Sequence, residues 1–352
     1  MKPATVGLSW IVAASVALAE PLPPRALAVV YANGTVVPVA AYHDGYWERW
    51  WVQPGERAPG QALDVGEALN APRSLADVPQ SWLGPLPAVP TTWAVLRDER
   101  DSASRRRFDV HVTGLTKYER YGRAGVGLRV RGFRIDPAVT KELSAHPGEP
   151  GGEVGVAATG GLALFDVTPP SASSPAFSTI RAYLEEQTLV MESMELRRLE
   201  SDVSLAGPGG RGLLAEAKRM IAAEGTERRT PLELHVYVAG RTDPDGATMG
   251  YFEANRTYKA PGNGSGGLSA LSAGWFARKE GYAPVLVEGA ATITSEADLR
   301  ISVQPLAGIT IGPAQYWLVA NVYEDGADYS IMDVSSKRIL IALDSRARAA
   351  FR

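Results

Sequence analysis

Three side chains that can exchange protons alternate along one apolar segment of the chain: Glu233, His235 and Tyr237. Residues two apart on a strand share a face, so a carboxylate, an imidazole and a phenol would stand side by side. If the next strand pairs in register, Glu253 faces them, and the set could supply a general acid and base for hydrolysis. We name Glu233, His235 and Glu253 as candidate catalytic residues. The alternative is the solvated face of a half-buried strand.

Aromatic side chains are concentrated near Tyr46 and Trp50. Aromatic rings stack on sugars, and strand alternation would place Tyr46 and Trp50 on one face and Trp47 and Trp51 on the other. We name Tyr46, Trp50 and Trp51 as candidate residues for binding a polysaccharide. The alternatives are a hydrophobic core and an interface with another protein.

Arginines form a third candidate surface. Residues 97–134 carry eleven Lys or Arg and five Asp or Glu, whereas residues 281–344 carry three and eight, so the chain is electrically polarised. The planar guanidinium groups of Arg129, Arg131 and Arg134 suit phosphate and carboxylate groups. We name these three as candidate ligands of an anionic envelope polymer. The alternative is a solvated basic face.

Metal and cofactor motifs are weak. The four histidines stand apart in the sequence and there is no cysteine, so we expect no zinc site, thiol nucleophile or disulfide. The acidic turns at 243–246 and 324–328 suit ordinary hairpins, with calcium as an alternative at the second. The sequence has neither a serine nucleophile elbow nor a phosphate-binding loop, and we expect no cofactor.

The first nineteen residues have the three parts of a secretory signal peptide. Lys2 gives the basic start, residues 6–18 the apolar run, and Ala17-Leu18-Ala19 the cleavage site. We therefore expect an exported protein, periplasmic or extracellular, with no transmembrane segment in the mature chain. Nucleic acid is then not an expected partner.

Turn signals predict β-structure in the N-terminal part. Asn33-Gly34 and Asp44-Gly45 separate three apolar segments between residues 28 and 51, which predicts two tight hairpins with type I′ turns. Residues 52–93 are rich in Pro and predict an ordered, irregular connection. Strands return over 106–135, where a change of alternation at Gly132 predicts a β-bulge.

One helix is clearly indicated. Ser174 can cap it and Pro175 can take its first position, and apolar residues then recur at the helical period to about residue 199. A second helix is expected over 213–224. The last third predicts a run of antiparallel strands over 232–239, 249–258, 272–279, 285–294, 299–304, 316–323 and 329–334.

Parts of the chain resemble a family of exported bacterial β-rich proteins without an assigned activity. The resemblance is carried by Tyr42-His43-Asp44-Gly45-Tyr46-Trp47, by Val78-Pro79-Gln80-Ser81-Trp82 and by Tyr251-Phe252-Glu253-Ala254. It implies export and a β-rich fold, and it assigns no site residue.

The sequence thus predicts a mainly β protein of packed antiparallel sheets, of sandwich or barrel type, with one helical segment near 175–224. The expected organisation is a signal peptide over 1–19, a β-rich region over 20–170, a helical segment over 171–228, a β region over 229–344 and a tail over 345–352. We expect a non-enzymatic binding or envelope-associated protein whose partner is a polysaccharide, an anionic polymer or another exported protein. The alternatives are a carboxylate-based hydrolase and a purely structural envelope component.

Overall fold

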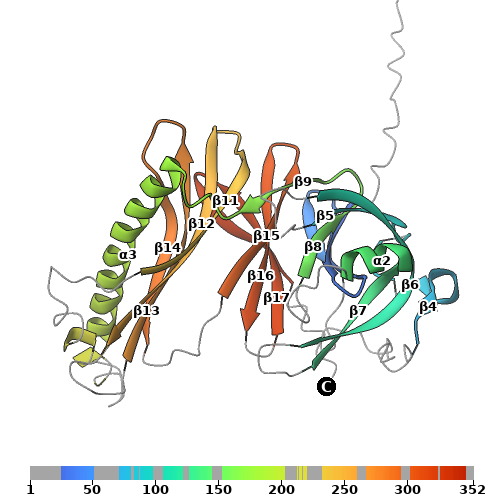
Figure 1. Cartoon of the computed structure of the whole chain (residues 1–352), viewed down its shortest axis with the longest axis horizontal. Helices are drawn as coiled ribbons and strands as arrows, with labels where there is room; N and C mark the ends of the chain where they lie inside the picture. Colours follow the sequence, from blue (N-terminus) through green and yellow to red (C-terminus); the bar gives the residue numbers. More distant parts are fainter. Residues whose placement is uncertain are drawn as a thin grey trace, which may run out of the picture.

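The computed structural model describes residues 25–50, 71–80, 83–86, 88–97, 106–121, 127–144, 153–202, 212, 214–215, 217–219, 232–259, 267–294, 302–323 and 326–345. The protein is mainly β, with antiparallel sheets and one main helix, as predicted. A barrel, two open sheets and the helix follow one another along the long axis (Figure 1). Among the described residues, no helix is long and apolar enough to cross a membrane.

Six strands close the barrel, in the order β1 (Arg25–Tyr31), β8 (Glu153–Ala158), β5 (Thr92–Arg97), β6 (Arg106–Tyr121), β7 (Gly127–Ile135) and β2 (Thr35–His43). Closure is achieved because β1 pairs with both β2 and β8. Three small elements are added to it: β3 (Tyr46–Arg49) beyond β2, β4 (Arg73–Ser74) beside β6, and the short helix η1 (Leu75–Asp77). Helix α2 (Pro137–Ser144) follows β7.

The two predicted hairpins β1–β2 and β2–β3 are both present. The second has the expected type I′ turn, with φ of 51° at Asp44 and 90° at Gly45. The first differs from the prediction, because only Gly34 has a positive φ there, 78°. The Gly34 N–H donates to the Tyr31 carbonyl at 2.9 Å, so Gly34 ends a type I turn instead of lying inside a type I′ turn.

The bulge predicted at Gly132 is wrong. The pairing of β7 with β6 runs without a slip through Gly132, and the irregularity lies in β6 between Val112 and Gly114. Gly132 instead allows β2 to approach closely, because a Cβ atom there would collide with Thr35. A glycine inside a strand marks either a bulge or a close approach, and here it is the approach.

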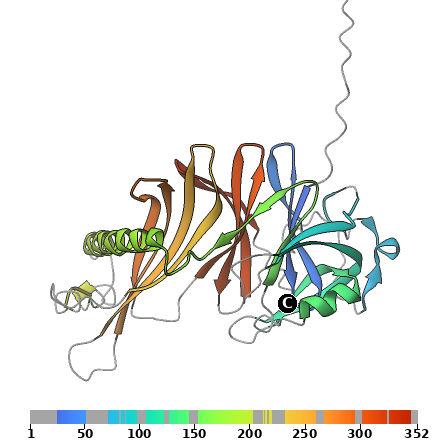
Figure 2. The ribbon, with the colours of Figure 1, turned by 45° about the horizontal axis from the view of Figure 1, so that its top comes forward.

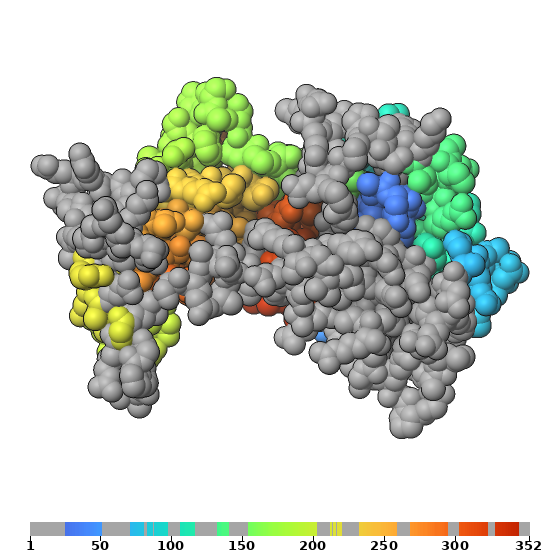
Figure 3. Space-filling model, turned by 60° about the horizontal axis from the view of Figure 1, so that its bottom comes forward, coloured from blue at the N-terminus to red at the C-terminus, as the bar shows by residue number. Residues whose placement is uncertain are grey.

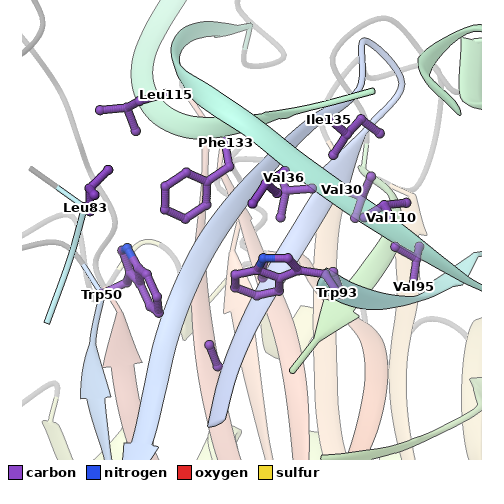
Figure 4. Close-up of a cluster of buried hydrophobic side chains, with 14 of the residues drawn as sticks. Val30, Val36, Trp50, Leu83, Trp93, Val95, Val110, Leu115, Phe133 and Ile135 are labelled. Atoms are coloured by element: carbon purple, nitrogen blue, oxygen red, sulfur yellow. The ribbon is translucent and has the colours of Figure 1, made fainter. Parts of the chain in front are cut away.

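The barrel interior is filled by side chains (Figure 4). Trp50 lies with its ring centroid 6.1 Å from Trp93 and 6.0 Å from Phe133. Leu83 and Leu86, from the Pro-rich connection, join this core. The predicted irregular connection therefore contributes to the barrel core in its described part.

The outer face of the barrel packs on the first open sheet, whose strands are β18 (Arg338–Ser345), β17 (Gly326–Ser335), β16 (Ala314–Tyr323), β15 (Ser302–Ile311) and β9 (Ala163–Phe165). The other face of this first open sheet packs on the second open sheet, formed by β10 (Val167–Thr168), β11 (Leu232–Thr242), β12 (Ala247–Lys259), β13 (Gly267–Lys279) and β14 (Val285–Thr294). We call these two open sheets the sandwich. The first of them, the middle sheet of the molecule, is covered on both faces, by the barrel and by the sheet β10–β14.

Helix α3 (Pro175–Asp202) covers the remaining face of the sheet β10–β14 (Figure 2). The predicted cap is present, since the Ser174 Oγ accepts from the Phe177 N–H at 3.1 Å. Ile180 and Leu184 are buried against Phe252 and neighbouring side chains. The described residues near the second predicted helix, 214–215 and 217–219, are helical. Strands β5, β8 and β18 and helix α2 were not anticipated.

Candidate functional site

The aromatic cluster is divided between two cores. Trp50 is 2% exposed inside the barrel, and Trp47 is 6% exposed between the barrel and the sandwich, where it contacts Tyr316. Trp47, in β3, and Trp50, just after it, therefore lie in different cores, as the predicted separation of the two tryptophans requires, and Trp50 presents no ring to a ligand. Tyr46 is 53% exposed, and Trp51 lies outside the described residues.

The register predicted for Glu233, His235 and Glu253 is present. His235 in β11 lies directly opposite Glu253 in β12, and the neighbouring pair is Glu233 with Asn255. His235 Nε2 is 3.5 Å from a Glu233 carboxylate oxygen, and the Asn255 amide donates to Glu233 at 3.4 Å. Both Glu233 and His235 have side chains more than half exposed.

Glu253 has a structural task in this group. One carboxylate oxygen accepts from the Tyr251 hydroxyl at 3.0 Å and from the Val303 N–H at 2.5 Å, which ties β12 to the start of β15. Burial, with a smaller effect of Glu253, raises the pKa of the Tyr251 phenol above its ordinary value, so that it serves as a donor. The arrangement offers an exposed imidazole beside a solvated carboxylate, with the partner carboxylate Glu253 engaged in hydrogen bonds between strands.

The candidate arginines lie on β7 of the barrel. Arg129 and Arg131 pair with Glu119 and Lys117 of β6, and their side chains lie outside the described part of the structure. Arg134 is exposed and pairs with Gly114 and with Thr35.

In the acidic turn at 243–246, the Asp243 carboxylate accepts hydrogen bonds from backbone N–H groups. One Asp243 oxygen accepts from the Asp245 and Ala247 N–H groups at 2.9 and 2.8 Å, and the other accepts from the Ser336 N–H at 3.0 Å. Asp243 thus joins the β11–β12 turn to the β17–β18 turn. The described residues contain no group of three or more side chains arranged to hold a metal ion, and Glu324 and Asp325 of the second acidic turn lie outside them.

A buried charged pair between α3 and β12 escaped the sequence analysis. The Arg256 Nε donates to Glu192 at 3.1 Å, and the Tyr258 hydroxyl donates to the same carboxylate at 2.5 Å. Both charged side chains are about 4% exposed. Arg256 and Tyr258 are two residues apart on β12 and therefore share a face of the strand. That spacing is the only feature of the sequence that indicates this site. The pair fixes the position of the helix on the sheet.

Three edge strands lie next to one another on one side of the molecule. β3, β18 and β14 each end the strand order of their sheet, and β18 contacts both β3 and β14. The Arg49 Nε donates to the Asp344 carbonyl at 2.9 Å and joins β3 to β18. We call this surface the edge flank, and we define it by the exposed apolar residues Tyr46, Tyr282, Val285, Leu340 and Ile341.

Exposed apolar side chains are concentrated on the edge flank. Of the seven large apolar residues that are exposed in the described part of the chain, five belong to these strands or to the turn before β14, and the other two lie on α3. Leu340, Ile341 and Ala342 are exposed consecutively. A run of three exposed apolar residues is typical of a functional surface.

In the space-filling view, described surfaces of the sheet β10–β14 (gold and orange), of the sheet β9–β18 (orange-red) and of the barrel (blue) follow one another along the molecule (Figure 3).

Comparisons of the chain with protein-family models, with curated proteins and with solved structures find no match.

Proposed function

We propose that this chain is an exported, non-enzymatic protein that binds another protein through the edge flank. The observation that carries the proposal is the concentration of exposed apolar side chains on three adjacent edge strands. Exposing Ile341 and Val285 to water costs solvation free energy that a partner would recover on binding. The exported part of the proposal is supported by the signal peptide predicted over residues 1–19, which lie outside the described residues.

A protein partner fits these observations better than a polysaccharide. Glycan binding would need a platform of exposed aromatic rings, but Trp50 and Trp47 are used in the cores. The edge flank instead offers aliphatic side chains beside strand edges, which suit another polypeptide. Tyr46 stays in the candidate site, now as a member of the edge flank.

The hydrolase alternative rests on Glu233, His235 and Glu253. Its weakness is that Glu253 already accepts two hydrogen bonds that join β12 to β15, while Glu233 is solvated. The decisive variant is Glu233→Gln with His235→Asn. If the native protein hydrolyses an envelope polymer and this double variant does not, the hydrolase replaces the binding function.

Photo-crosslinking tests the proposed function. A photo-reactive amino acid is placed at Ile341, at Val285 or, as the matched control, at Ala138, an exposed apolar residue of the barrel helix α2, which is not part of the edge flank. In the host, we expect the first two positions to give adducts with the same protein and the control to give none. Equal labelling from Ala138, or no protein adduct from the edge flank, would contradict the proposal.

Export is tested separately by the mature N-terminus. Mass spectrometry of the protein from the envelope or culture fraction should show a chain that begins at Glu20. Recovery of the uncleaved chain from the cytoplasm alone would remove the exported part of the proposal.

A further inference from the structure

Strand β14 has the properties of a strand-addition site. It ends its sheet, and in the described residues its strand pairing is with β13. Its first residues are less suited to a partner strand, because a register shift lies between Leu286 and Glu288 and the Leu286 N–H donates to the Tyr183 hydroxyl of α3 at 2.6 Å. From Glu288 to Thr294 the pairing is continuous, without a bulge, and this stretch contains no Pro and one charged residue. Natural edge strands are commonly protected by bulges, charges or proline, so a straight and nearly uncharged edge is suited to pairing with another strand.

The sandwich-side face of β14 continues rows of side chains that cross the whole sheet. Three residues of β14 end these rows. Each row consists of the residues that lie directly opposite one another on β11, β12, β13 and β14. In that order of strands, the rows are Tyr237, Tyr251, Trp275 and Glu288; His235, Glu253, Ala273 and Ala290; and Glu233, Asn255, Leu271 and Thr292. The three end residues are exposed. A strand added beside β14 would therefore extend these rows by one position.

The rows determine which side chains such a strand should carry. They contain three carboxylates, Glu233, Glu253 and Glu288, and neither Lys nor Arg. Opposite charges across a strand pair attract, so a basic residue is favoured opposite Glu288. The next row ends in the small residues Ala273 and Ala290, which leave space for a large apolar side chain opposite Ala290.

We propose that β14 binds an extended segment of another protein as an additional antiparallel strand, with a large apolar residue two positions before a basic residue. The order follows from direction: every strand pair in this sheet is antiparallel, so the residue opposite Ala290 precedes the one opposite Glu288. This inference rests on the proposed function and specifies its partner. The main-chain bonds give affinity and the two side chains give selectivity.

The test uses the full chain and short capped peptides in which Thr and Val surround the order Phe-Thr-Lys. Fluorescence anisotropy should show binding, and hydrogen exchange should slow in residues 288–294. Replacing the peptide Lys by Glu, or reversing the order to Lys-Thr-Phe, should each weaken binding about two- to fivefold, the range expected for one cross-strand pair. N-methylation of the peptide backbone at alternate residues should abolish binding.

Charge reversal sharpens the test. The variant Glu288→Lys should prefer the Glu peptide over the Lys peptide, and because Glu288 is exposed the fold should be unaffected. Equal binding of the N-methylated peptide, or no protection of residues 288–294, would overturn strand addition. Concentration-dependent dimerisation through β14 without peptide binding would replace it by self-association. Crosslinking from Ile341 that persists while the peptides fail would leave the proposed function standing and overturn only this inference.

Discussion

The barrel and the sandwich are built from the same kind of antiparallel hairpins, but they end their sheets differently. In the barrel, β1 pairs with both β2 and β8, so the six strands all have partners on both sides. In the sandwich, β14 and β18 each pair on one side within the described residues. Closure removes edges, whereas open sheets keep them. The long open edges are therefore on the sandwich, while the barrel sheet ends in the short edge strand β3 beyond β2.

Aromatic side chains have two uses, which depend on burial. Trp50 and Trp93 lie in the closed interior of the barrel, and Trp275 and Trp317 lie in the sandwich core. Tyr282, in the turn before β14, is among the most exposed apolar residues of the sandwich. The buried aromatic residues of both regions thus contribute to stability, and those on the edge flank are available for binding.

The strongest test of this division is Trp50→Ala. Removing a fully buried indole leaves a cavity beside Trp93 and Phe133, and we expect a loss of about 3–5 kcal/mol in the free energy of unfolding. The matched control is Tyr46→Ala, which removes an exposed ring and should cost less than about 0.5 kcal/mol. Urea unfolding measures both. Equal losses would break the distinction between core and surface aromatic residues.

Charged pairs show the same contrast between buried and exposed positions. Arg256→Ala leaves the Glu192 carboxylate buried without its cation, and we expect a loss of about 3–5 kcal/mol. Arg181→Ala breaks the exposed pair with Glu185 and should cost less than about 0.5 kcal/mol. The double variant Glu192→Leu with Arg256→Met should recover much of the loss. Thermal and urea unfolding measure these changes. If the double variant recovers none of the lost stability, the charged pair itself is the main source of stability at this site.

The Asp243 turn is a smaller test, within the sandwich. Asp243→Ala removes the acceptor of three N–H groups, including that of Ser336, and should cost about 2–3 kcal/mol. Asp245→Ala, which breaks the exposed pair with Lys337, is the matched control and should leave the free energy of unfolding nearly unchanged. Calcium or a chelator should leave the melting temperature of the native protein unchanged. A calcium-dependent rise that Asp243→Ala abolishes would contradict the backbone role.

The edge flank should tolerate polar substitution. Leu340→Lys and Ile341→Lys are expected to change the free energy of unfolding by less than about 0.5 kcal/mol, because both side chains are already solvated. They should nevertheless abolish the crosslinked adduct obtained from Val285. A large loss of stability would show that these side chains are part of the sandwich core.

The smallest expected effect is a pH dependence at the tip of the β2–β3 hairpin. The hydrogen bond from His43 to Glu48, at 2.7 Å, and the neighbouring Asp44 raise the pKa of the imidazole above its ordinary value. Because the raised pKa belongs to the folded state, protonated His43 stabilises the hairpin at a pH below the ordinary value, and the contribution is lost as the pH rises through the raised pKa. NMR titration should show the raised pKa, and Glu48→Gln should lower it. An unchanged His43 titration in that variant would exclude Glu48 as the cause.

Local patterns were sufficient wherever the chain interacts with near neighbours. The Asp44-Gly45 turn, the Ser174 cap of α3 and the pairing of His235 with Glu253 all follow from residues close in the sequence or joined by one turn. They were predicted because backbone geometry and strand alternation act over a few residues. The bulge at Gly132 was predicted wrongly because this position is a glycine for another reason. A side chain there would collide with Thr35 of β2, which is distant in the sequence.

The sequence by itself determined the antiparallel β architecture, most hairpins and the main helix, because these depend on turn chemistry and periodicity. Tertiary structure alone decided which face of each strand is covered and which strands end a sheet. Alternation separated Trp50 from Trp47, but only barrel closure and the packing of the sandwich buried both. Arg256 and Glu192 are distant in sequence and meet only when α3 lies on its sheet. The edge flank likewise follows from the order of strands, a property of the assembled sheets that no local pattern contains.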